Sequence, residues 1–197
     1  MATYQAVAAT GQAILGLLAD ACPRDEFPGA RFELYGPSDF KTPMDEGVSL
    51  YLYRIGVNTS RRSLPPRVGP DGRRFRPPLP LDLQYLLTAW ARTAARQQRL
   101  LGWAVRALED TPVLPAGLLN HFGPEPDVFQ PHETVELICD PVSLQDLVNI
   151  WDPFKASTQL GMTYVARMVA LDSALELREG GPVQVQARAF DHAGIER

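Results

Sequence analysis

Two stretches of the chain repeat apolar residues at the spacing of an amphipathic helix. In residues 4–22 the apolar positions return every three or four residues, and the opposite face carries small or polar side chains. Pro23 should end this helix, because its ring cannot continue the backbone hydrogen bonds. A second helix is predicted over residues 93–109. The predicted inner faces are Tyr4, Val7, Gly11, Ile14, Leu15, Leu18 and Cys22 in the first helix, and Gln97, Leu100, Leu101, Ala104, Val105 and Leu108 in the second.

Apolar runs of period two predict the strands of a sheet. Residues 48–57 are rich in β-branched and aromatic side chains on both alternating faces, which is typical of a strand that is covered on both sides or lies at a subunit contact. The next strand along the chain carries Leu81, Leu83, Tyr85 and Leu87 on one face. A short helix with Ser143 as its capping residue is predicted over residues 143–151. Further strands are predicted at residues 31–36, 134–139 and 161–172, and in a hairpin about Gly180 and Gly181 that ends in the edge strand 183–190.

The order of these elements predicts the fold class. It indicates a single α+β domain with a mainly antiparallel mixed sheet, flanked by the N-terminal helix and the central amphipathic helix. The 197 residues, of which 45% are hydrophobic, can bury one sizeable core. We expect this domain to occupy residues 1–190 and to be followed by a short tail at 191–197. No apolar run is long enough to span a bilayer and no signal peptide is recognisable, so a cytoplasmic protein without a membrane partner is expected.

Charge is distributed very unevenly along the chain. The formal net charge is -4, but residues 61–76 carry six arginines and one aspartate, which gives this window +5 and leaves -9 on the remainder. Six prolines between residues 64 and 80 stiffen the same segment, and no helical or strand period runs through it. We therefore treat residues 58–80 as a long Arg/Pro-rich loop that is functional or becomes ordered on binding. Its candidate contact residues are Arg61, Arg62, Arg67, Arg73, Arg74, Phe75 and Arg76.

A second basic feature lies on the helix predicted at residues 93–109. Four arginines fall along one line of its outer face, and a tryptophan lies among them. Tryptophan and arginine are enriched at the energetic centres of protein interfaces, so an exposed tryptophan in a basic stripe favours a contact surface over a merely solvated face. The stripe consists of Arg92, Arg96, Arg99, Trp103 and Arg106.

The chain lacks the residue patterns of common catalytic and cofactor sites. It contains no phosphate-binding glycine loop, no dinucleotide fingerprint and no nucleophile elbow. His132 and Glu133 begin like a zinc-hydrolase motif, but the position of the second histidine is Glu136 and the segment is predicted to be a strand. Cys22 and Cys139 are expected to be small buried hydrophobes. We therefore predict a protein that is not an enzyme, with no catalytic residue, cofactor or metal; a hydrolase around His132 remains a weak alternative.

Three interpretations of the Arg/Pro-rich loop remain open on these residues alone. A nucleic-acid-binding arm would neutralise phosphates, but the acidic remainder would repel the same polymer and only Phe75 alternates with the arginines. A docking arm for an acidic protein surface, ordered on assembly, fits the charge better. A solvated loop without a partner is the third interpretation.

The order of motifs resembles one known family. From about residue 2 to residue 187 the chain is similar to the cap, or tube-terminating, proteins of phage-tail-like extracellular contractile injection systems. The resemblance rests on the segments VSLYLYRIGVN, LPLDLQYLLTAWA, ARQQRLLGWAVRALEDTPVL, VELICDPVSLQDLVNIWDPF and MTYVARMVALD.

The resemblance implies a tail-terminator-like fold and a structural, non-enzymatic role. It implies a subunit of a hexameric ring that ends the inner tube at the baseplate-distal end and joins it to the contractile sheath, in a particle that is either released or retained in the cell. We expect the Arg/Pro-rich loop to contact tube or sheath. The edge strand, with Val183, Val185 and Arg188, is the candidate for strand addition to a sheath subunit or a neighbouring cap subunit.

Overall fold

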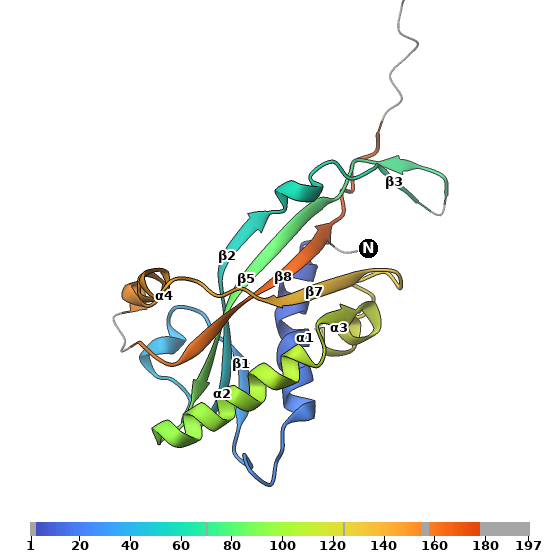
Figure 1. The fold of residues 1–197 in the computed structure, drawn as a ribbon. Helices are drawn as coiled ribbons and strands as arrows, with labels where there is room; N and C mark the ends of the chain where they lie inside the picture. Colours follow the sequence, from blue (N-terminus) through green and yellow to red (C-terminus); the bar gives the residue numbers. More distant parts are fainter. Residues whose placement is uncertain (1–2, 70, 124, 155–157, 178–197) are drawn as a thin grey trace, which may run out of the picture.

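A curled mixed sheet forms the centre of the molecule (Figure 1). In this computed structural model the described residues are 3–69, 71–123, 125–154 and 158–177, and within them the sheet has six strands in the order β1-β2-β5-β8-β7-β6. β1 is parallel to β2, and every other neighbouring pair is antiparallel. The strands are β1 (Arg31–Leu34), β2 (Gly47–Val57), β5 (Leu79–Trp90), β6 (Val113–Pro115), β7 (Thr134–Cys139) and β8 (Gly161–Leu171).

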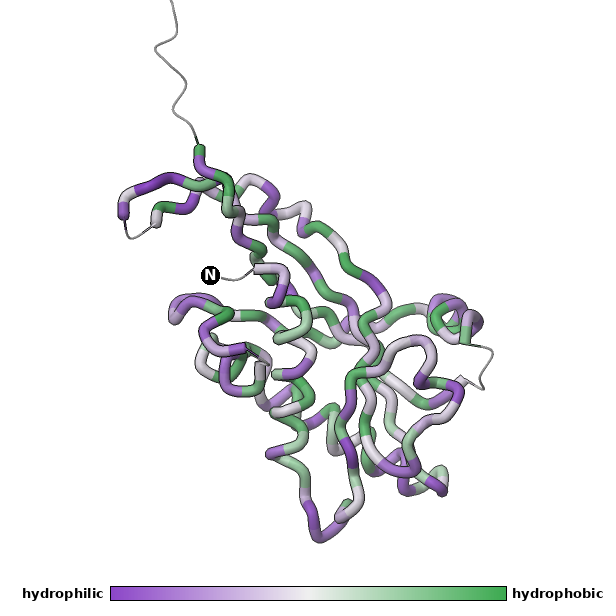
Figure 2. The backbone as a smooth tube through the Cα atoms, turned by 180° about the vertical axis from the view of Figure 1, so that it is seen from behind, coloured by the Kyte–Doolittle hydropathy of each residue, from purple (hydrophilic) through white to green (hydrophobic). Residues whose placement is uncertain are grey.

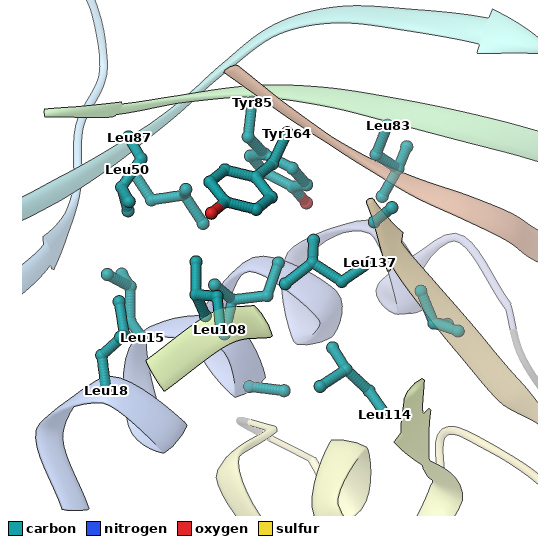
Figure 3. Packing of buried hydrophobic residues seen from close by; sticks show 14 of the residues in the cluster. Leu15, Leu18, Leu50, Leu83, Tyr85, Leu87, Leu108, Leu114, Leu137 and Tyr164 are labelled. Carbon is teal, nitrogen blue, oxygen red and sulfur yellow. The ribbon is translucent and has the colours of Figure 1, made fainter. Parts of the chain in front are cut away.

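Helices cover the two faces of the sheet unequally. α1 (Gln5–Ala21), α2 (Ala94–Glu109) and α3 (Ala116–Phe122) pack on one face, where the larger hydrophobic core lies. Figure 3 shows side chains of α1 and α2 meeting Leu50, Tyr85 and Leu87 of the sheet. On the other face, α4 (Leu144–Trp151) and the 3-10 turns η1 (Asp39–Lys41) and η3 (Asp152–Phe154) enclose a smaller aromatic cluster. The predicted α+β class is confirmed.

The strands and the two long helices lie where the apolar periods predicted them. The buried face of α1 was predicted only in part: Gly11, Ile14, Leu15, Leu18 and Cys22 are buried as predicted. Tyr4 is 80% exposed, whereas Ala6, Ala9 and Ala13 are completely buried. The reason is a close approach between α1 and α3: a Cβ atom on Gly16 would lie 2.3 Å from the Phe122 ring. Small residues thus form a second packing surface on α1 that a search for large apolar side chains overlooks.

The sequence analysis predicted no helix or strand between residues 109 and 134, but this segment contains β6 and α3. The short helix α3 follows Pro115, and its Asn120 side chain holds the next loop by accepting from the Phe129 amide at 2.8 Å and donating to the Phe129 carbonyl at 2.9 Å. β6 has three residues and ends at Pro115, and α3 has seven. Both elements are too short to repeat an apolar pattern that could be recognised in the sequence. The hairpin predicted about Gly180 and the edge strand 183–190 lie outside the described residues.

Candidate assembly surfaces

Part of the Arg/Pro-rich loop is folded into a small β-ribbon that projects from one end of the sheet (Figure 2). β3 (Arg67–Val68) pairs antiparallel with β4 (Arg74–Phe75) around a turn in which the Gly72 amide donates to the Gly69 carbonyl at 3.0 Å. Residues 175–177 pair with the other edge of β4: the Arg76 amide donates to the Leu175 carbonyl and the Leu177 amide to the Arg74 carbonyl, at 2.9 and 2.8 Å. We call residues 67–69, 71–76 and 175–177 the ribbon. The sequence analysis predicted neither the strands nor their pairing.

On the inner face of the ribbon, two of the six arginines of residues 61–76 have partners in the same chain. Arg67 lies over the Phe75 ring, with its guanidinium carbon 4.3 Å from the centroid, and its Nε is 3.5 Å from an Asp172 carboxylate oxygen. Arg73 pairs with Glu176 at 2.9 Å and with Asp71 at 3.0 Å. The hydrogen bond to Glu176 is the main cause that raises the pKa of the Arg73 guanidinium. Arg67, Arg73 and Phe75 therefore hold the ribbon together.

The outer face of the ribbon is mixed apolar and basic. Cross-strand partners point to the same side of a sheet, and the registers Val68–Arg74 and Phe75–Glu176 place the outer residues opposite Phe75. Val68 is 62% exposed and Leu175 is 58% exposed. Among the described residues, no side-chain hydrogen bond or ion pair involves Arg74 or Arg76. We define the outer face as Val68, Arg74, Arg76, Leu175 and Leu177.

A buried polar network fixes the point where the loop leaves the sheet. Asn58 is 3% exposed, and its side-chain NH2 group donates to both Asp82 carboxylate oxygens at 3.0 Å. The Asn58 side-chain oxygen accepts from the Arg61 amide, capping the 3-10 turn η2 (Thr59–Arg61). Asp82 also accepts from the Met168 amide at 3.2 Å. The sequence analysis did not identify this network, because Asn58 and Asp82 are 24 residues apart. Arg61 and Arg62 follow it as exposed residues, without a side-chain partner in the part of the chain that the structure describes.

The tryptophan in the basic stripe of α2 is less exposed than the sequence analysis expected. Trp103 is half-buried and packs on the larger core, with its ring centroid 6.0 Å from that of Phe32 in an edge-to-face arrangement and 6.3 Å from that of Phe27. The expectation of an exposed tryptophan is therefore wrong. Helical spacing put Trp103 on the outer side of α2, but the loop containing Phe27 and strand β1 cover that side.

Every arginine of the α2 stripe has an acidic partner in the same chain. Arg96 forms an ion pair with Glu46, donates to the Glu26 carbonyl at 2.8 Å and lies 5.3 Å from the centre of the Phe27 ring. The hydrogen bond to Glu46 is the main cause that raises the pKa of the Arg96 guanidinium. The other pairs are Arg92 with Asp45 at 3.7 Å, Arg99 with Glu26, and Arg106 with Asp110. The stripe is thus largely neutralised, which leaves little unbalanced positive charge for a partner.

A groove of about 920 Å³ lies on the side of the sheet that carries α4. Its wall includes Tyr51 and Tyr53 of β2, with Asp140 and Asp146 on the side of α4. Burial raises the pKa of the Tyr53 hydroxyl. Beside this groove, residues 51–57 of β2 pair only with β5 among the described strands, because β1 ends at Leu34. This half of β2 is therefore an open edge within the described residues.

The residues of the weak hydrolase alternative lie around another cavity, of about 610 Å³. His132 and Glu136 are exposed, and Glu136 belongs to strand β7, so the helical spacing of a zinc-hydrolase motif is missing. Glu133 accepts from the Gln130 amide at 2.6 Å, and burial raises the pKa of its carboxyl group. No group of three or more metal-ligating side chains occurs within the described residues. Nor is any helix of the described part long and apolar enough to cross a bilayer.

The family model of the Pvc16 N-terminal domain matches residues 9–185 of this chain. The chain belongs to this family. Membership confirms the resemblance inferred from the sequence motifs. The matched residues include the ribbon, α2, α1 from Ala9 onward and all the strands described above.

Solved structures share the fold of this family member. The PVC sheath/tube terminator of an extracellular contractile injection system, in its extended state, has a TM-score of 0.62 at 16% identity over 96% of this chain and 64% of that chain. The tube-terminating cap of the anti-feeding prophage has a TM-score of 0.53 at 15% identity over 92% of this chain and 59% of that chain. The chain thus spans less than two thirds of either structure. A comparison with curated proteins gives no match.

Proposed function

We propose that this protein is a structural cap of a contractile injection system. The observation that carries the proposal is the family match over residues 9–185, together with a shared fold over 96% of the chain with a sheath/tube terminator. In this role the protein ends the inner tube at the baseplate-distal end of the particle and joins it to the sheath. The cap is a hexameric ring and performs no catalysis.

Termination makes a specific demand on the surface of the subunit. The ring has to bind the last tube ring on one side and offer no site for a further tube ring on the other, while its own subunits make head-to-tail contacts that close. The open edge of β2, the groove beside it and the ribbon are separate surfaces that supply such contacts.

Tube and sheath subunits are the proposed partners of these surfaces. Arg61 and Arg62 at the base of the ribbon contribute to the contact with tube or sheath. The strand 183–190, which includes Val183, Val185 and Arg188, adds to a sheet of a sheath subunit or of a neighbouring cap. These residues lie outside the described part of the chain, so their role rests on the alternating sequence alone. The particle is assembled in the cytoplasm and is then either released or retained there.

The contacts of the arginines weigh against the nucleic-acid-binding alternative. Phe75, the aromatic side chain of the ribbon, is covered by Arg67 and is not available as a stacking platform for bases. The α2 stripe is paired with carboxylates along its length. An acidic protein surface remains the better match for the arginines that are left.

Electron microscopy of particles made with and without the gene tests the proposed function. We expect deletion to give inner tubes of widely varied length and sheaths that detach or contract, because nothing stops tube growth or fixes the sheath end. Complementation with the wild-type gene should restore a narrow length distribution. Tubes of normal, uniform length with attached sheaths in the deletion strain would refute the cap assignment.

A further inference from the structure

A second exposed surface of the molecule carries acidic side chains, whereas the outer face of the ribbon carries basic ones. α4 is held against the sheet by Trp151, which is 1% exposed, but it turns other apolar side chains outward. Leu144 is 77% exposed and Val148 is 41% exposed, and both lie on one line with Asp152 at a spacing of four residues. Asp146 is exposed on the same helix, but it follows Leu144 by two residues and therefore lies on the opposite flank, beside the groove. We call Leu144, Asp146, Val148 and Asp152 the α4 surface.

The α4 surface lies in the most one-sidedly acidic part of the chain. Residues 133–154 contain five carboxylates and no lysine or arginine. Neither Asp146 nor Asp152 forms an ion pair within the described residues. Lys41 and Arg54 line the opposite wall of the neighbouring groove and make no such pair with Asp146. The acidic charge of α4 is therefore available to a partner.

The outer face of the ribbon and the α4 surface are complementary. The first carries Arg74 and Arg76 among exposed apolar side chains, within a window of +5. The second carries Asp152 in line with Leu144 and Val148, and Asp146 on the other flank of the same helix, within a segment of -5. Interfaces of this kind combine an apolar centre with opposite charges that fix partner and register.

The two surfaces lie too far apart to meet within one molecule. The ribbon leaves the end of the sheet where β2 and β8 end, whereas α4 lies between the last residue of β7 and the first residue of β8. Both overall views show the ribbon and α4 at different extremities of the molecule (Figures 1 and 2). Since a single chain carries both halves of a complementary pair, the occupant that the charges favour is a second copy of this chain.

We propose that the outer face of the ribbon docks on the α4 surface of a neighbouring copy. The contact is head-to-tail, because two different surfaces meet, and repeated contacts of this type close into a ring when the rotation allows. Arg74 and Arg76 pair with Asp146 and Asp152, while Val68, Leu175 and Leu177 cover Leu144 and Val148. The closure of these contacts into a ring rests on the proposed function. The contact between two copies does not, and it can be tested with the purified protein alone.

A charge exchange tests the contact. We would prepare the wild type, a ribbon variant with Arg74→Glu and Arg76→Glu, and an α4 variant with Asp146→Arg and Asp152→Arg, and measure self-association by analytical ultracentrifugation at low and high salt. We expect salt-sensitive self-association of the wild type, and at least about tenfold weaker association of each variant alone. An equimolar mixture of the two variants should associate again, because each remaining contact then joins opposite charges.

A matched control separates this contact from a general effect of charge. The variant with Arg92→Glu and Arg106→Glu changes the net charge as much as the ribbon variant does, but its substitutions lie in the α2 stripe, and it should associate as the wild type does. A wild type that stays monomeric at every concentration, variants that associate normally, or a mixture that fails to recover would each overturn the proposed contact. None of these results bears on tube length in the deletion strain, so the cap assignment is judged separately. If the ribbon variant fails only to attach to isolated tubes or sheaths, the ribbon binds those proteins and the proposed self-contact is wrong.

Discussion

The α2 stripe and the ribbon are equally rich in arginine along the sequence but differ in what the arginines do. On α2, four arginines each have a carboxylate partner in the same chain, and Trp103 packs on Phe27 and Phe32. In the loop that carries the ribbon, Arg67 and Arg73 hold the inner face together, whereas Arg61, Arg62, Arg74 and Arg76 are exposed without a side-chain partner among the described residues. The number of charges in a segment therefore does not indicate how many are available for binding.

The difference has a physical origin in where the acidic residues lie. The α2 stripe faces the loop of residues 23–30 and the turn before β2, which together supply Glu26, Asp45 and Glu46. The ribbon projects away from the body, and within the described residues its arginines pair only with Asp71, Asp172 and Glu176. We therefore expect substitutions in the α2 stripe to affect stability, and substitutions on the outer face of the ribbon to affect association.

The largest expected effect is that of Trp103→Ala. Removing the half-buried ring deletes its contacts with Phe27 and Phe32 and should lower the free energy of unfolding by about 3 kcal/mol. Urea denaturation followed by far-UV circular dichroism measures this change, and Trp103→Phe, which keeps an aromatic ring, should lose clearly less. Unchanged stability together with lost self-association would mean that Trp103 belongs to an interface after all.

The next effect concerns the anchor at the base of the ribbon. Asp82→Ala leaves the buried Asn58 side chain and the Met168 amide without their acceptor, which should cost about 2 kcal/mol. The same variant should be cut faster by trypsin at Arg61 and Arg62, because the turn that Asn58 caps is released. Asp82→Asn keeps one acceptor oxygen and serves as the control. Wild-type stability in Asp82→Ala would show that the network does not hold the loop.

A smaller and more local effect is expected for Phe75→Ala. The substitution removes the surface on which the Arg67 guanidinium lies, a contact worth about 0.5–1 kcal/mol at such a site. Hydrogen exchange should speed up at the Gly69 amide, which donates to the Arg73 carbonyl at 2.8 Å, while the global unfolding transition stays in place. Phe75→Tyr should retain slow exchange. A loss of global stability as large as that of Trp103→Ala would make the ribbon part of the core.

Much of the fold could be predicted from periodicity. A strand or helix that is covered on one face repeats its apolar side chains at the period of that element. Leu81, Leu83, Tyr85 and Leu87 alternate along β5 as predicted, and all are buried. Thr93 and Ser143 begin α2 and α4 by accepting from the amide three residues later, as helix-capping residues do. The elements that were not predicted are short or contain proline, as in β6, α3 and the two strands of the ribbon.

The candidate surfaces could be predicted only in outline. The sequence located the Arg/Pro-rich loop and the α2 stripe, but pairings such as Arg73 with Glu176 join residues 103 positions apart, and nothing local indicates them. The α4 surface was not predicted either, because Leu144 and Val148 read as ordinary core positions of an amphipathic helix. Leu144, Val148 and Trp151 lie on one line of the helix, but of these three only Trp151 belongs to the aromatic cluster, so the exposure of the other two results from tertiary structure.

The smallest expected effect lies at the edge of the α2 stripe. Arg92 and Asp45 approach to 3.7 Å, but their side chains are 82% and 84% exposed, so solvent screens the pair and side-chain entropy opposes it. Arg92→Ala should change the free energy of unfolding by less than about 0.5 kcal/mol and leave self-association as in the wild type. A double-mutant cycle with Asp45→Asn measures the coupling directly. A coupling above about 1 kcal/mol would show that even the most exposed pair fastens the turn before β2 to α2, and that the stripe acts as one network.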